Sequence, residues 1–197
     1  MAARGLTVRP MCRQRCEMAS PRDADATHRG REAPPEMRVP RPYESKPADE
    51  MTMSRAWLTH LRESAIFKLE DLDDEQLRWK PTATANSLGT IVVHLGFAER
   101  LWVRAIFAGE SMDMGWRAHM FDLPAGWSVD EVVSFYRGET AAGDAVLDGT
   151  TSLDALSTAD IRPTTLRWVV THLIEETARH VGHMDITREL LDGRIGR

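Results

Sequence analysis

Apolar and polar positions between residues 166 and 190 alternate at steps of three and four, which predicts one core-facing stripe on a long amphipathic helix. The stripe begins with apolar residues and turns polar in its middle. Its members are Leu166, Val169, Leu173, Glu176, His180, His183, Thr187 and Leu190. Ionisable groups on a core-facing stripe are costly unless something compensates them. The polar part of this stripe is therefore the first place to look for a functional site.

Three other segments show helical periodicity, over residues 48–69, 87–108 and 128–149. Ser87 is suited to cap the second of these helices, and Ser128 with Glu131 forms the S-x-x-E pattern of a capping box at the third. The last helix should run from about residue 165 to 191 and end at Gly193. Residues 75–87, 109–127 and 150–163 are expected to be mostly loop.

No segment alternates convincingly over the length of a strand, so the pattern predicts an all-α four-helix bundle. The connections are long enough for helices that are not consecutive to pack together. The loop over residues 109–127 is rich in aromatic and methionine side chains, including Trp116 and Phe121. We expect these side chains either to pack back onto the bundle or to line the mouth of a pocket.

The second helix carries a histidine, His94, on its own apolar stripe. A lone histidine in this position is more often a core residue than a ligand. However, Glu176 and His180 are four residues apart on the last helix, and such residues share a face with Cβ atoms about 5–6 Å apart. Glu176 and His180 could therefore hold one ion together, with His94 as the third ligand. A buried Glu–His hydrogen bond without metal is the alternative, but it leaves His94 unexplained.

Two imidazoles and a carboxylate suit Zn²⁺, Ni²⁺, Fe²⁺ or Mn²⁺ better than Ca²⁺, and we expect Zn²⁺ first. Three protein ligands leave at least one coordination position for water or substrate, as in catalytic sites. Such an ion lowers the pKa of a bound water or thiol. Arg179 and Arg188 flank the polar stripe, either as contacts for an acidic substrate or as solvated surface residues.

Charge and composition divide the 197-residue chain into two parts. Residues 1–40 hold eight arginines against five acidic residues, whereas the rest holds 17 basic and 25 acidic residues. An acidic domain argues against nucleic-acid binding. Seven of the ten prolines fall within residues 1–50, so we interpret residues 1–45 as a disordered extension and residues 46–193 as the bundle domain. We find no secretory signal and no transmembrane span.

Both cysteines, Cys12 and Cys16, lie in the extension. Their spacing would allow a metal clip or a disulfide, but two incidental thiols are the simpler interpretation. The bundle domain then has no disulfide framework, which is consistent with a reducing cytoplasm.

Two motifs carry a family resemblance: SLGTIVVHLGFAERLW at residue 87 and LRWVVTHLIEETARHVGHMDITRELLDG at residue 166. Together they resemble the DinB-like (YfiT-like) superfamily over about residues 40–193. The nearest branch is an actinobacterial one related to mycothiol-dependent maleylpyruvate isomerase. The resemblance implies a four-helix bundle in up-up-down-down order, often a homodimer, with a divalent metal ion between helices.

The resemblance also assigns the ligands. The family histidine on the second helix matches His94, and the family pair on the last helix matches Glu176 and His180. His183 stands where other members often have glutamine, which leaves it as an accessory ligand or a neighbour of the ligands.

Three functions remain open from the sequence. The first is metal-dependent transfer or isomerisation with a low-molecular-weight thiol cosubstrate such as mycothiol, acting on a small molecule. The second is a non-catalytic metal-binding or stress-associated protein. The third is hydrolysis by metal-bound water.

Overall fold

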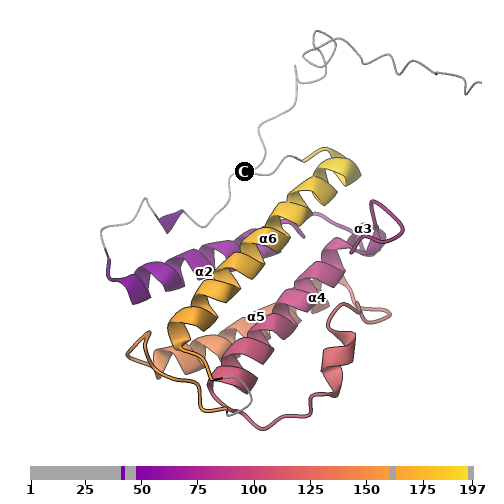
Figure 1. Cartoon of the computed structure of the whole chain (residues 1–197). Coiled ribbons are helices and arrows are strands. Elements are labelled where there is room, and N and C mark those ends of the chain that lie inside the picture. Colours follow the sequence, from indigo (N-terminus) through magenta and orange to yellow (C-terminus); the bar gives the residue numbers. More distant parts are fainter. Residues whose placement is uncertain (1–40, 43–47, 160–162, 195–197) are drawn as a thin grey trace, which may run out of the picture. The chain divides into compact units, whose positions relative to one another are not determined.

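The computed structural model describes residues 41–42, 48–159 and 163–194 (Figure 1). The disordered extension predicted for residues 1–45 lies outside the described residues apart from Arg41 and Pro42, as do Cys12 and Cys16. The described part is helical and contains no strand, only an isolated bridge between Leu156 and Thr165. None of its helices is long and apolar enough to cross a lipid bilayer.

Four long helical segments build the bundle, as predicted. They are α2 (Glu50–Phe67), α4 (Leu88–Glu99) continuing into the π-helical η2 (Arg100–Phe107), α5 (Val129–Asp148) and α6 (Leu166–Asp192). Two short helices lie in the connections: α3 (Asp74–Arg78) and the 3₁₀-helix η3 (Gly115–His119).

The helix ends follow from capping side chains in the sequence. Ser87 caps α4, and Ser128 and Glu131 form the complete capping box of α5. Thr165 caps α6, which ends at Gly193 in the left-handed conformation with φ 80°. The predicted starts of α4, α5 and α6 and the predicted stop of α6 are therefore confirmed.

Side-chain pairs fix the directions of the helices. Arg167 pairs with Glu50 near the starts of α6 and α2, and Lys68 lies 2.6 Å from Asp185 near their ends, so α2 and α6 are parallel. Glu139 of α5 pairs with Arg100 and Arg104, which follow α4. Gly96 lies beside Phe135, whereas the later Glu99 and Val103 lie beside Gly143, so α4 with η2 runs parallel to α5.

The two parallel pairs run in opposite directions. His94 of α4 meets Glu176 of α6, and Asp148 at the end of α5 pairs with Arg55 near the start of α2. In the spatial order α2, α6, α4, α5 the directions therefore read up, up, down, down, whereas along the chain they read up, down, down, up (Figure 1). The expected bundle arrangement is confirmed.

The second half of the second helix differs from the expected regular α-helix. Residues 100–107 adopt π-helical geometry, and the amide of Ala108 donates to the carbonyl of Val103 at 2.9 Å. Nothing in the apolar periodicity signals this switch. It begins directly after Glu99, whose buried carboxylate accepts two hydrogen bonds from Arg62 of α2 at 2.7 and 2.8 Å.

The stripe predicted on α6 rotates as the helix proceeds. His183 and Leu190 are exposed, whereas Met184 and Arg188 are buried instead. A straight α-helix has 3.6 residues per turn, so a stripe drawn at alternating steps of three and four drifts by about 20° every seven residues. Along α6 this drift moves His183 and Leu190 out of the core, whereas Thr187 stays buried.

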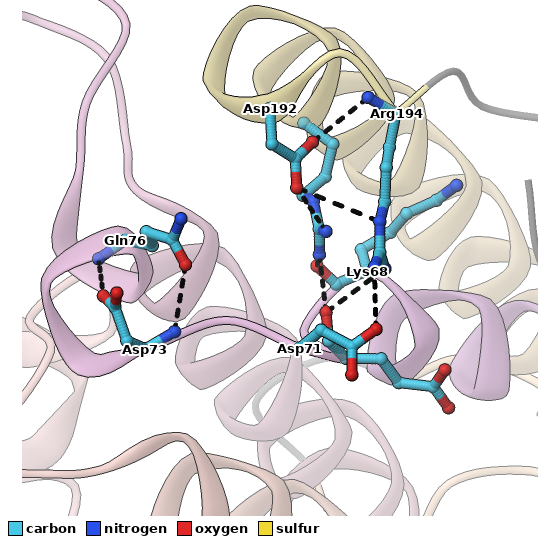
Figure 2. Close-up of polar contacts among 8 residues, drawn as sticks. Lys68, Asp71, Asp73, Gln76, Asp192 and Arg194 are labelled. Atoms are coloured by element: carbon cyan, nitrogen blue, oxygen red, sulfur yellow. Dashed lines mark hydrogen bonds and ion pairs between the residues drawn. The ribbon is translucent and has the colours of Figure 1, made fainter. Parts of the chain in front are cut away.

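The ends of α2 and α6 are held together by Arg188. Its guanidinium donates to the backbone carbonyls of Lys68 and Glu70 at 2.7 and 3.0 Å and to the Asp192 carboxylate at 2.5 Å. Figure 2 shows Asp192 beside Arg194, above the turn that carries Asp71. Arg188 is only 2% exposed, so neither a solvated surface role nor a substrate contact fits it.

The segment after this turn contains the short helix α3, where mostly loop was expected. Asp73 and Gln76 form a capping box that starts it, and Figure 2 shows the two reciprocal hydrogen bonds, at 2.8 and 3.1 Å. Leu77 of α3 is fully buried against the bundle, which stabilises a helix too short to form by itself.

Candidate metal site between α4 and α6

Three side chains from α4 and α6 converge between the two helices. His94, Glu176 and His180 each offer one donor atom, and all three atoms lie within 4.8 Å of one another. The Nε2 atom of His94 is 2.9 Å from Oε1 of Glu176, and Nε2 of His180 is 3.3 Å from the same oxygen. We refer to these three residues as the donor group. Within the described part of the chain, it is the one group of three or more such residues that could hold a metal ion.

One distance in the donor group matches the spacing of two ligands around a tetrahedrally coordinated ion of the zinc class. Ligand atoms about 2.1 Å from such an ion lie about 3.4 Å from each other in a tetrahedron. The distance from His180 to Glu176 is close to this value. The shorter distance from His94 to Glu176 is that of a hydrogen bond between the two side chains.

The charges of the site favour the protonation states that bind metal. Burial acts to raise the pKa of Glu176, but the hydrogen bond from His94 and the charges of the neighbouring histidines outweigh it, and the net pKa is lowered. Burial and the charge of His94 lower the pKa of His180, although Glu176 opposes them. At neutral pH the site therefore presents a carboxylate and a neutral imidazole, the forms that bind a cation.

Ring packing sets the orientation of the two imidazoles. The ring of Phe121 stacks on His94 with centroids 3.9 Å apart and planes 12° apart, and the ring of His180 meets His94 edge-on at 4.9 Å. The Nδ1 atoms of both histidines are buried and have no hydrogen-bond partner within the described residues. Their geometry consequently depends on neighbouring rings rather than on a hydrogen bond at the second nitrogen.

Phe121 is a site neighbour that the sequence did not identify. It belongs to the loop over residues 109–127, whose apolar residues were expected to pack on the bundle or line a pocket mouth. Met112, Met114, Trp116 and Met120 of this loop do pack against the core. Phe121 is 46% exposed and lies over His94 instead. Composition alone cannot distinguish these two fates of an aromatic residue.

The other polar residues on or near the stripe of α6 do not belong to the donor group. His183 is exposed, stands outside the donor group and meets the ring of His180 edge-on at 5.6 Å. Arg179 is exposed and pairs with Glu175 on the same helix. His172 stacks on Trp168, with centroids 4.9 Å apart. An accessory ligand role for His183 stays a prediction.

Comparisons with known proteins agree with this architecture. A family model described as mycothiol-S-transferase matches residues 53–193. A conserved protein from Enterococcus faecalis superposes with a TM-score of 0.56 at 14% identity, covering 75% of this chain and 100% of that one. A DinB-like protein from Bacillus cereus gives a TM-score of 0.51 at 20% identity, covering 68% and 90%. These two likenesses show the fold alone.

No curated protein matches the sequence significantly. The family model, however, spans well over half of the chain and includes both helices that carry the donor group. The chain therefore belongs to the mycothiol-S-transferase family and has the DinB-like fold.

Proposed function

We propose that the protein transfers a low-molecular-weight thiol of the mycothiol type to an electrophilic small molecule, with a divalent metal ion held by His94, Glu176 and His180. Isomerisation through reversible thiol addition is a variant of the same chemistry. The observation that carries the proposal is the convergence of three metal-binding atoms from α4 and α6 within 4.8 Å. The family match supports the thiol as cosubstrate.

Zinc is the first expectation for the ion, with nickel, iron or manganese as alternatives, because two imidazoles and one carboxylate suit this group of metals. When bound, an ion of this kind lowers the pKa of a coordinating thiol, so that the nucleophilic thiolate is available at neutral pH.

The residues of the chain supply orientation and charge. Glu176 accepts a hydrogen bond from His94 and so joins α4 to α6 before an ion binds, and both side chains would turn to the ion when it is present. Its negative charge partly offsets the positive charge of the ion, whereas the imidazoles are neutral ligands. Phe121 covers one face of His94 and keeps solvent from that side of the ring. A reducing compartment such as the cytoplasm suits a thiol substrate.

Two measurements test the proposal. Elemental analysis of the purified protein should find close to one equivalent of a divalent transition metal, and both His94→Ala and His180→Ala should lose it. Loss of free mycothiol in the presence of electrophiles should require the metal. A protein that binds no metal even after reconstitution would contradict the ligand assignment.

A metal-loaded protein can still fail the second measurement. If it consumes no thiol with any electrophile, the transfer reaction is wrong and a binding function replaces it. If it cleaves ester or amide substrates without thiol, the reaction is hydrolysis by water instead. Glu175→Gln serves as the comparison for both assays, because Glu175 is exposed, pairs with Arg179 and stands outside the donor group.

A further inference from the structure

Three aromatic rings pack together beside the donor group. The ring of Trp102 in η2 meets Trp168 of α6 with centroids 4.9 Å apart and meets His172 of α6 edge-on at 4.5 Å. Trp168 and His172 stack on each other at 4.9 Å with planes 20° apart. We call these three residues the aromatic cluster.

The aromatic cluster repeats the arrangement of the donor group. In both, one residue from α4 or η2 contacts two residues of α6 that are four apart. Trp102 follows His94 by eight residues, and Trp168 precedes Glu176 by eight residues on the antiparallel helix. The two sets therefore lie on the same seam between the helices. His172 is one turn from Glu176, about 6 Å along the axis, and Trp168 is about 12 Å away.

In the aromatic cluster the indole of Trp168 is exposed to solvent and packs on two more buried rings. Trp168 is 45% exposed, whereas Trp102 is 9% exposed. His172 is partly buried between them. A ring held by two other rings keeps its orientation at little conformational cost, so it can bind a planar molecule without being ordered first. The face of an indole is electron-rich and stacks best against an electron-poor ring.

We propose that the aromatic cluster binds the planar, electron-poor part of the electrophilic substrate while its reacting atom lies at the donor group. The inference rests on the proposed thiol transfer, because it assigns the second substrate of that reaction. It selects aromatic or conjugated electrophiles over small aliphatic ones. A ring stacked on the cluster lies between one and two turns of α6 from Glu176, about 6–12 Å along the axis.

A simple reaction represents this class. With 1-chloro-2,4-dinitrobenzene, the thiolate sulfur of mycothiol forms a bond to the ring carbon that carries chlorine. The carbon–chlorine bond then breaks, chloride leaves with the electron pair, and the thiol proton passes to the buffer. No oxidant or reductant is needed. Iodoacetamide undergoes the same displacement of a halide but has no ring to stack.

The test compares Trp168→Leu with the wild type, both loaded with zinc, on these two electrophiles. We expect kcat/KM for chlorodinitrobenzene to fall roughly three- to tenfold, mostly through KM, because one aromatic stacking contact is lost. The kcat/KM of Trp168→Leu for iodoacetamide should stay within about twofold of the wild-type value. Trp168→Phe, which keeps an aromatic ring, should retain most of the wild-type kcat/KM for chlorodinitrobenzene. Trp57→Leu is the matched control, because Trp57 lies on α2 and meets His60 instead of the cluster.

Equal losses for both electrophiles, or no loss for either, would overturn the assignment of the cluster. If the wild type consumes thiol with neither electrophile, the proposed transfer fails, and binding is measured by itself. Saturation-transfer NMR with unreactive 1,3-dinitrobenzene should then show contact with the wild type and a clearly weaker signal with Trp168→Leu. Equal signals from the two proteins would also overturn the inference.

Discussion

His94 and Glu176 are 82 residues apart in the sequence, and their side chains are joined by a hydrogen bond of 2.9 Å between Nε2 and Oε1. This contact connects α4 to α6 at the level of the donor group. A metal ion would engage the same two side chains in place of this hydrogen bond, because a nitrogen that donates a proton cannot bind the ion at the same time. The same geometry therefore stabilises the packing of the two helices and prepares the binding site for a cation.

Replacing Glu176 with glutamine should weaken metal binding strongly. The change keeps the size of the side chain and its ability to accept a hydrogen bond from His94, but it removes the negative charge. We expect the affinity for Zn²⁺ to fall at least about 100-fold, measured by competition with a chromogenic chelator. Glu175→Gln is the matched control, because Glu175 is exposed and pairs with Arg179. Equal affinities for the two variants would remove Glu176 from the ligands.

Much of the bundle could be predicted from short-range chemistry. Ser128 with Glu131 and Thr165 with Gly193 mark helix ends through local hydrogen bonds and backbone conformation, which depend on a few neighbouring residues. The donor pair on α6 could also be recognised, because a spacing of four places side chains on one face.

Features that depend on distant contacts could not be predicted. Phe121 stacks on His94 because its loop packs back onto α4, and the burial of Arg188 depends on two carbonyls at the end of α2. The exposure of His183 follows from the rotation of the stripe along a straight helix. Neither spacing nor composition contains this information.

Removing the ring of Phe121 should loosen the metal site without removing a ligand. Phe121→Ala takes away the ring that stacks on His94, whose Nδ1 has no hydrogen-bond partner in the described structure to hold it instead. We expect the affinity for Co²⁺ to fall a few-fold to about tenfold, with altered visible absorption of the bound ion. Leu123→Ala, in the same loop but near Leu77 and Gly89, should leave the spectrum unchanged. An unchanged spectrum for Phe121→Ala would show that the stacking has no part in orienting His94.

The buried pair of Arg62 and Glu99 should matter more for stability than an exposed pair on the same helix. Arg62 is 5% exposed and Glu99 1% exposed, and the two side chains share two hydrogen bonds. Glu99→Gln leaves the guanidinium with Asp144 as its remaining acidic partner, at 2.8 Å. We expect the free energy of unfolding to fall by about 3–5 kcal/mol, measured by urea denaturation.

The control for this change is Glu63→Gln. Glu63 pairs with Arg137 at 2.8 Å, where the arginine is half-exposed, and the expected loss is below about 1 kcal/mol. Similar losses of unfolding free energy for Glu99→Gln and Glu63→Gln would mean that burial does not make the Arg62–Glu99 pair more important for stability than an exposed pair.

The Asp192 carboxylate should stabilise the contact between α2 and α6 that Arg188 makes, and this stabilisation should depend on pH. Burial acts to raise its pKa, but the hydrogen bonds and charges of Arg188 and Arg194 outweigh burial, and the pKa lies below its ordinary value of 3.8. Because the folded state binds the proton more weakly than the unfolded state, the stabilisation is fully present above pH 3.8. The stabilisation is lost as the pH falls through the lower pKa that Asp192 has in the folded protein.

Asp192→Asn should therefore reduce the free energy of unfolding at pH 7 by roughly 0.5–1 kcal/mol, a modest value because the carboxylate is partly open to solvent. The difference from the wild type should shrink toward zero as the pH is lowered from about 5 to below 3. Chemical denaturation across this range measures it, with Glu189→Gln on the exposed face of the same helix as control. A difference that stays constant at every pH would mean that Asp192 acts through packing or neutral hydrogen bonds, because only a charge effect disappears on protonation.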